Sequence, residues 1–326
     1  MHDKRRISRQ AALGLAATAA IVMLGLFLFT HNEADVDLWG NVGFVRHLPT
    51  SPQYHLTNTF SFTEPDHVWV NHEWLAEYIL HHAHRLYGNP GLLLLKVLLG
   101  FALIGILYRS MRKQCRSAPV RVLMLAIVMS TMGYGFSTRP HLFTYILIAS
   151  LLSALLRPKP HPTLLLIAAP LGCLWANLHG AFFIGQILLL LAAACAALKR
   201  TTGHANSWRP TILLGAAAVA FFLGSLLTPY GLGLWGFVSE SAGIFRPILS
   251  EWAPFNPFEH FSDHVDFMAL ASITIFTVLV SISHCSAFGL LVLVLSLVAA
   301  FVMRRNIPIF AIAAALIATR HVDETL

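Results

Sequence analysis

Charged residues are scarce in this 326-residue sequence, and their scarcity argues against a soluble protein. Asp, Glu, Lys and Arg make up 11% of the chain, whereas 56% is hydrophobic. A soluble globular domain carries about 25% charged residues. The formal net charge is +7, but the basic residues form no single tract, so we expect no nucleic-acid partner. The composition therefore predicts an integral membrane protein with little soluble mass.

The motifs of several enzyme classes are also missing. The chain has 4 cysteines and no C-x-x-C pair, so we expect neither a zinc or redox site nor a disulfide framework. No G-x-S-x-G, Walker A or G-x-G-x-x-G sequence occurs, which argues against serine hydrolases and nucleotide-binding proteins. A group transfer catalysed by this chain would draw its energy from an activated donor.

Long apolar runs dominate the rest of the sequence. A membrane-spanning helix needs about 17–25 mostly apolar residues. The runs predict an all-α, polytopic transmembrane bundle of about ten spans, which forms a single integral membrane domain over residues 1–326. The first run is too long for a signal-peptide core, and no A-x-A-like site follows it, so we expect a retained helix. The candidate spans are 11–30, 91–108, 120–136, 141–156, 162–176, 180–198, 211–227, 267–283, 286–303 and 307–319.

The distribution of charge predicts how the bundle is oriented. Most lysines and arginines fall on the side of the strongly basic N-terminus, and most acids fall on the opposite side. The positive-inside rule places the N-terminus in the cytoplasm. The two long loops, 31–90 and 228–266, then face the periplasm or the exterior. We therefore expect a multi-pass protein of the inner (plasma) membrane whose active face is the outer one.

The first outer loop holds the candidate catalytic residues. Asp35 and Asp37 follow the first span, and acids at i and i+2 can bind a divalent cation such as Mg or Mn. One of them can instead act as a general base, or both can simply obey the charge topology. His72 and Glu73 stand beside two tryptophans at a predicted helix start, and we add them to the catalytic candidates. No cofactor is certain from these residues.

The end of the same loop predicts an amphipathic helix that lies in the membrane interface. It would run from Asn71 to Tyr87, with Asn71 as its N-cap. Its apolar face would consist of Leu75, Ile79, Ala83 and Leu86. Its polar face would consist of Glu77, His81, His84 and Arg85.

Further polar residues mark the outer ends of later spans. Arg139 has the planar guanidinium that suits a phosphate, although an arginine at a membrane edge can merely reach for the surface. Arg304 and Arg305 oppose the positive-inside trend, and an anionic lipid headgroup is the simplest reason for them. Asn177 and His179 lie in a tight turn between two spans, where they bind a ligand or cap helix ends. The substrate-binding candidates are Arg139, His141, Asn177, His179, Glu251, Arg304 and Arg305.

Taken together and in this order, the motifs resemble those of bacterial GT-C superfamily membrane glycosyltransferases. The resemblance covers most of the chain, with Gly40-Asn41 and Thr57-Asn58-Thr59 as departures from the family pattern. It rests on Asp35-Val-Asp37-Leu-Trp39, Thr59-Phe-Ser-Phe-Thr63, Trp69-Val-Asn-His-Glu-Trp-Leu75, Arg139-Pro140, Trp175-Ala-Asn-Leu-His-Gly180, Pro229-Tyr-Gly231, Glu251-Trp252 and Arg305-Asn306-Ile-Pro308.

The resemblance implies an inverting transfer of a sugar from a polyprenyl-phosphate carrier to an envelope glycan, lipid or protein acceptor. It gives Asp37, with Asp35 as partner, the role of activating the acceptor or binding a metal. The donor phosphate would be bound by Arg139, Arg304 or Arg305, and the lipid tail by a groove between spans.

Two other classes stay open. One is a transporter or flippase of a lipid-linked glycan, and the other is a non-catalytic envelope-assembly subunit. Transporters place charges near the bilayer midplane, but here Lys96 alone lies deep in a predicted span.

Overall fold

The computed structural model describes residues 2–31, 33–45, 62–63, 68–244, 249–259 and 261–325. Within these ranges the chain is all-α, with twelve α-helices and no strand. Residues 59–61 of one predicted motif lie outside the described residues. The helices are α1 (His2–Phe29), α2 (Leu38–Phe44), α3 (Trp74–Gln114), α4 (Ala118–Met132), α5 (His141–Leu155), α6 (Thr163–Leu178), α7 (Phe183–Thr201), α8 (Arg209–Ser225), α9 (Leu232–Gly243), α10 (Val265–Val280), α11 (Ala287–Val302) and α12 (Ile307–Thr325).

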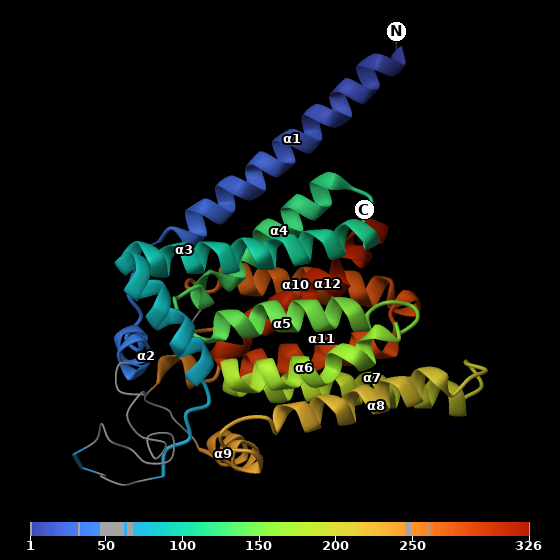
Figure 1. Ribbon diagram of the computed structural model, residues 1–326. Coiled ribbons are helices and arrows are strands. Elements are labelled where there is room, and N and C mark those ends of the chain that lie inside the picture. Colours follow the sequence, from blue (N-terminus) through green and yellow to red (C-terminus); the bar gives the residue numbers. More distant parts are fainter. Residues whose placement is uncertain are drawn as a thin grey trace. The chain divides into compact units, whose positions relative to one another are not determined.

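The helices labelled in Figure 1 belong to two compact units, and the division falls within α3, between Leu95 and Lys96. Unit 2 contains the chain from α2 to the middle of α3 and from α5 to α9, and unit 1 contains the rest. Unit 1 comprises Met1–Glu33, Lys96–Phe136 and Pro247–Leu326, and unit 2 comprises Ala34–Leu95 and Ser137–Arg246.

Two helical stretches in the described part have the length and composition to cross a membrane. They are Trp74–Gln114 and Gly180–Thr201. Most other apolar helices have 10–17 residues, which is shorter than a full span. The helical fold class is therefore confirmed, whereas ten spans are not shown.

The last helix, α12, is the centre of unit 1. It packs against α4, α10 and α11, and from Ile307 to Thr319 only Ile309 is not fully buried. A helix buried on every side needs no polar face. Its many alanines let neighbouring helices approach closely, but they also weaken its hydropathy signal. The weakest predicted span is therefore the most enclosed helix of its unit.

Lys96, the charge noted inside a predicted span, has a local role in unit 1. Its side chain is buried, and Nζ donates a hydrogen bond to the His31 carbonyl oxygen at 2.5 Å. That oxygen follows the C-terminal end of α1, where a helix favours a cation. Lys96 therefore ties α3 to the end of α1.

The bundle of α5 to α8 forms the larger part of unit 2. α6 and α8 are in closest contact, and glycines make this possible. A Cβ at Gly172 would lie 2.1 Å from the Phe221 carbonyl oxygen, and one at Gly224 would lie 2.0 Å from that of Ala169. No side chain fits at such distances, so the two backbones touch directly.

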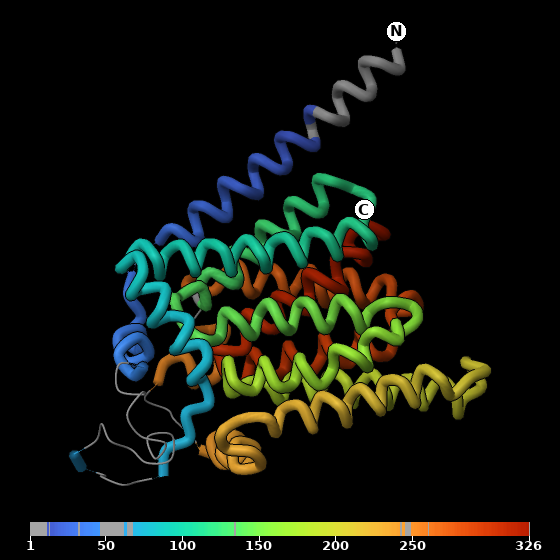
Figure 2. Tube along the Cα trace, in the orientation of Figure 1, coloured from blue at the N-terminus to red at the C-terminus, as the bar shows by residue number. Residues whose placement is uncertain are grey.

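The predicted interfacial helix exists as the first part of α3. Gly88 has non-helical angles (φ 63°, ψ −150°) and Pro90 follows, so the helix bends sharply there, as Figure 2 shows. The predicted polar face was wrong at Glu77, which is buried. The buried face includes Leu80, which packs with Leu38 and Val42 of α2. The face is rotated because α2 covers this side of the helix.

Candidate functional site

The turn before α3 is held by hydrogen bonds on several sides. The Asn71 backbone N–H donates to the Tyr230 hydroxyl oxygen at 3.0 Å, and Asn71 Nδ2 donates to the Glu77 carboxylate at 2.5 Å. Asn71 Oδ1 accepts from the backbone N–H of Glu73 at 3.0 Å, close to the predicted capping role. Asn71 and Glu77 are both buried. Because buried polar groups need partners, these bonds fix the turn in place.

One carboxylate oxygen at this turn is shared by two imidazole rings. Glu73 Oε1 lies 3.4 Å from His72 Nε2 and 3.3 Å from His179 Nε2. His179 comes from the corner between α6 and α7, where its side chain is buried. Glu73 therefore joins the start of α3 to a corner more than a hundred residues further along the chain. The structure brings together three predicted site residues here.

The second ring nitrogen of His179 determines its tautomer. Nδ1 accepts from the Ala181 backbone N–H at 3.3 Å and lies 3.0 Å from Thr144 Oγ1. Thr144 Oγ1 accepts from Trp175 Nε1 at 2.8 Å, so its own hydrogen points elsewhere and can be donated to Nδ1. With Nδ1 as an acceptor, we assign a proton to Nε2, which faces Glu73 Oε1 at 3.3 Å. The His179 ring is therefore oriented from both sides.

Gly180 makes room for the other ring. A Cβ at Gly180 would lie 2.6 Å from His72 Cδ2, which is much closer than non-bonded carbons approach. The His72 ring also lies beside Phe237 of α9, with 4.9 Å between centroids. The glycine that follows His179 is thus required for the place of His72 next to Glu73.

Burial and charge act in opposite directions on this pair. Burial favours a neutral carboxyl, but the hydrogen bond and charge of His72, with contributions from His179 and His141, lower the pKa of Glu73 to about 2. Burial also acts to lower the pKa of His72, but the hydrogen bond and charge of Glu73 outweigh it and raise that pKa. Glu73 is therefore ionised at neutral pH and holds protons weakly.

The aspartate pair forms a second cluster in unit 2. Arg139 Nε lies 3.4 Å from Asp35 Oδ1, and Arg139 Nη2 donates to Asp37 Oδ2. The Asp37 backbone N–H donates to Asp35 Oδ1 at 3.0 Å, which sets their spacing. The Asp37 side chain is 52% exposed, compared with 15% for Asp35 and 21% for Arg139. One carboxylate of this cluster is therefore open to a ligand.

The start of α5 reaches both clusters. Arg139 stands just before the helix, and His141 is its first residue and acts by its charge on Glu73. Thr144, one turn later, contacts His179. Residues three apart lie on one helix face, so His141 and Thr144 point the same way. The sequence at 139–144 thus positions residues for two acid clusters.

The aspartate pair, as arranged, does not fit a divalent cation. Both carboxylates already face the cationic guanidinium of Arg139. No group of three or more His, Cys, Asp or Glu side chains suited to a metal occurs among the described residues. We therefore derive no chemical step through a metal.

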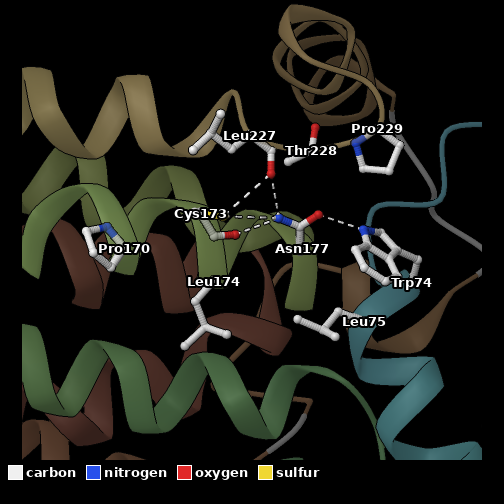
Figure 3. Close-up of a pocket in the computed structure, with 9 residues that line it drawn as sticks. All are labelled: Trp74, Leu75, Pro170, Cys173, Leu174, Asn177, Leu227, Thr228 and Pro229. Atoms are coloured by element: carbon white, nitrogen blue, oxygen red, sulfur yellow. Dashed lines mark hydrogen bonds between the residues drawn. The ribbon is translucent and has the colours of Figure 1, made fainter.

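Asn177 braces three segments of unit 2, as Figure 3 shows. Its Oδ1 accepts from Trp74 Nε1 at 2.6 Å, and its Nδ2 donates to the carbonyl oxygens of Cys173 at 2.7 Å and Leu227 at 3.0 Å. Both amide hydrogens are thus engaged within the protein. This geometry favours the helix-capping role over direct contact with a ligand.

An open apolar groove of about 570 Å³ lies beside this brace. Its surface consists almost entirely of apolar atoms and includes no charged side chain, so it suits a hydrocarbon chain. The groove is lined by Trp74, Leu75, Pro170, Cys173, Leu174, Asn177, Leu227, Thr228 and Pro229 (Figure 3).

The remaining predicted residues belong to unit 1. Arg305 Nη1 lies 4.0 Å from Glu251 Oε1, and its guanidinium carbon lies 4.4 Å from the centre of the Trp252 ring. Arg304 adjoins them in the short 3₁₀ helix before α12. The predicted candidates therefore separate into a set in unit 2 and a set in unit 1.

Sequence reasoning did not select several residues that shape the clusters. Thr144 orients His179, but a threonine inside an apolar helix gives no signal of its own. Glu77 was assigned to a solvated face. Tyr230 belongs to a quoted motif, although its contact with Asn71 joins segments 159 positions apart. A pattern of local spacing cannot predict such a pairing.

Comparisons with known proteins leave the motifs as the only basis for a family assignment. No protein-family model matches the chain, and no curated protein matches it significantly. The resemblance to GT-C glycosyltransferases accordingly rests on the residues themselves.

Proposed function

We propose that this chain is a multi-pass inner-membrane glycosyltransferase with about ten spans. It would transfer a sugar from a polyprenyl-phosphate carrier to an envelope glycan, lipid or protein acceptor on the outer face. The proposal combines the membrane character of the helices, the arrangement of the two acid clusters and the motif resemblance.

Exposed apolar side chains support the membrane location. Large hydrophobic residues stand in the open on helix after helix, including Leu166 at 76%, Ile212 at 67%, Val219 at 59% and Val298 at 54% exposed. The helices of a soluble monomer rarely expose so many large apolar side chains. The acyl chains of a lipid bilayer would cover these apolar side chains. The shorter helices would then cross a locally thinned bilayer or insert partway.

The observation that carries the proposal is the half-exposed Asp37 bound to Arg139. A carboxylate beside a guanidinium provides a proton acceptor and an anion-binding group at one place. A phosphate that enters here competes with the carboxylates for Arg139. A donor phosphate bound to Arg139 would thus leave the Asp37 carboxylate free to accept a proton.

The reaction follows from these roles. The acceptor hydroxyl oxygen attacks the anomeric carbon of the donor sugar and gives its proton to Asp37. The bond between that carbon and the phosphate oxygen breaks, and the negative charge remains on the polyprenyl phosphate next to Arg139. Asp35 keeps Arg139 and Asp37 in register through its hydrogen bonds. The apolar groove lined by Leu174 and Leu227 suits the isoprenoid tail.

Glu73 has a different role in this scheme. Its low pKa, lowered to about 2, makes it a poor general base at neutral pH. One of its oxygens already lies 3.4 Å from His72 Nε2 and 3.3 Å from His179 Nε2. We assign Glu73 and His72 to positioning the α3 turn, and Asp37 to proton transfer.

The test is sugar transfer in membranes that contain the full chain. Purified polyprenyl-phosphate sugars serve as donors and cell-envelope glycan as acceptor. We compare the natural chain with Asp37→Asn, with Glu259→Gln as a matched exposed acid in unit 1, each with and without a chelator. We expect transfer by the natural chain and the control, loss in Asp37→Asn, and no effect of the chelator.

Other outcomes separate the alternatives. If Asp37→Asn is as active as the natural chain, Asp37 is not the catalytic base. Loss of activity with chelator would restore the metal to the mechanism. If neither the natural chain nor any variant consumes donor while labelled lipid crosses the bilayer, the chain is a flippase and not a glycosyltransferase. If neither occurs, an envelope-assembly subunit is the remaining alternative.

A further inference from the structure

A corner of unit 1 holds two arginines on a rigid support. The 3₁₀ helices Ser250–Trp252 and Arg304–Asn306 meet there. The Arg304 backbone N–H donates to the Ala253 carbonyl at 3.1 Å, and the Phe255 N–H donates to the Phe301 carbonyl at 2.8 Å. The ring of Phe255 packs edge-on against Phe267, with centroids 5.0 Å apart. The backbone of this corner is therefore fixed from both sides.

The arginine side chains are only partly neutralised. Arg305 lies flat enough over Trp252 to make a cation–π contact, with 4.4 Å between its guanidinium carbon and the ring centre. Its ion pair with Glu251 is long, at 4.0 Å. Arg304 Nε is buried and has no hydrogen-bond partner among the described residues. A buried donor without a partner is unfavourable, so this corner has unused capacity to bind an acceptor.

The nearby helix adds to the positive potential. α12 begins at Ile307, directly after the two arginines, and the N-terminal end of a 19-residue helix favours anions. In the predicted orientation the corner faces outward, where the positive-inside rule disfavours arginine. A tryptophan next to arginines is also typical of the depth at which lipid headgroups lie.

We propose that Arg304 and Arg305, with Trp252 and the start of α12, bind the phosphate of a lipid headgroup. Glu251 is the counter-ion that the phosphate displaces. The planar fork of an arginine binds two phosphate oxygens at once. The phosphate belongs to an anionic phospholipid or to a polyprenyl phosphate, which share this group. The inference rests on the membrane location proposed above, but not on sugar transfer.

The experiment measures lipid binding by the purified full-length protein. The protein in detergent micelles is titrated separately with phosphatidylglycerol, with a C55 polyprenyl phosphate and with inorganic phosphate, and native mass spectrometry gives the bound fraction. The variants are Arg304→Ala/Arg305→Ala and Glu251→Gln. Arg320→Ala, which removes an exposed arginine at the other end of α12, is the matched control.

We expect the double variant to bind lipid phosphate at least about tenfold more weakly, because two charge-assisted contacts are lost. Glu251→Gln should bind more tightly, since no carboxylate competes for Arg305. This second variant tests the site even if the double variant folds poorly. Arg320→Ala should bind as the natural chain does. Weakened binding of only one lipid by the double variant identifies the source of the phosphate.

Unchanged lipid affinity in the well-folded double variant overturns the proposal, as does an equal loss in Arg320→Ala. Tighter binding of inorganic phosphate than of either lipid also overturns it. Asp37→Asn should bind lipid normally while it fails to transfer sugar. Failure of the transfer reaction and failure of this site therefore give different results.

Discussion

The two acid clusters of unit 2 use the same chemical groups in opposite ways. In one, Asp37 is 52% exposed and faces an arginine. In the other, the Glu73 side chain is 21% exposed and is shared between His72 and His179. Both clusters depend on the start of α5. The difference is that the first keeps an accessible carboxylate, whereas the second uses its carboxylate to join segments of the fold.

This difference separates the residues that act on a ligand from those that hold them in place. A carboxylate with an exposed oxygen can exchange its partner for a ligand at low cost. One whose oxygen is shared by two fixed rings can do so only if the surrounding structure moves. The comparison predicts that substitutions in the two clusters affect different measurements.

Glu73→Gln should give the largest loss of stability. It leaves His72 without its partner in a partly buried place, and breaking a buried pair costs about 3–5 kcal/mol, less here because the pair is partly exposed. We expect a free energy of unfolding lower by about 2–3 kcal/mol, measured by thermal unfolding in micelles. Asp37→Asn, the matched change in the other cluster, should alter the melting temperature little. Equal melting temperatures of Glu73→Gln and Asp37→Asn would contradict a structural role for Glu73 and a ligand-directed role for Asp37.

Arg139→Lys should reduce sugar transfer while the protein stays folded. Lysine keeps the charge but cannot bridge two acids or bind two phosphate oxygens. We expect kcat/KM for the donor to fall by about tenfold or more. Steady-state kinetics with varied donor measures this. Lys96→Arg would not serve as a control, since Lys96 is buried; Lys159→Arg, on an exposed turn, is suitable. Full activity in Arg139→Lys would show that a point charge suffices.

Gly180→Ala should have an intermediate effect on stability. Its Cβ would stand 2.6 Å from His72 Cδ2, so the ring must move away from Glu73. Forcing an extra carbon into a packed place costs about 1–3 kcal/mol. Thermal unfolding measures the loss, and Gly215→Ala, where a Cβ meets nothing within 4 Å, is the control. A neutral result would mean that the His72 ring has another place to go.

The sequence predicts the all-helical class and identifies which residues belong to the acid clusters. It does not predict which of these residues contact one another. Asp35, Asp37 and Glu73 stand out because acids are rare in so apolar a chain, and His72 stands out because it adjoins Glu73. The pairing of Glu73 with His179 could not be predicted, because it depends on how two distant helix corners pack. The polar face of the first part of α3 was misassigned at Glu77 for the same reason, since Glu77 is buried and pairs with Asn71.

Local sequence patterns also could not predict which apolar helix is the most deeply buried. A hydropathy pattern describes one run at a time, and it made 307–319, a short run rich in alanine, the weakest predicted span. Its central place in unit 1 comes from small side chains that admit close neighbours. Burial on every side is a property of the packed helices and not of a single run.

The dependence of stability on pH should be the smallest of these effects. It tests whether His72 and Glu73 form a pair of charges. Because the pKa of His72 is raised in the folded chain, its pairing stabilises the fold below its ordinary pKa of about 6.5. That contribution disappears as the pH rises through the raised value. The pKa of Glu73, lowered to about 2, acts on the other side. Its contribution is present above about 4.5 and disappears as the pH falls toward 2.

Melting temperatures across this range would therefore fall at both ends, and buried Glu77, whose pKa burial raises to about 8, adds to the alkaline fall. In His72→Gln the alkaline fall should flatten, because the group that loses its proton is gone. His161→Gln, an exposed histidine of the same unit, should keep the natural curve. If His72→Gln also keeps it, then Glu73 is held by His179 alone. The second cluster would then stabilise the fold without a charged histidine at position 72, unlike the first, in which Arg139 pairs with two carboxylates.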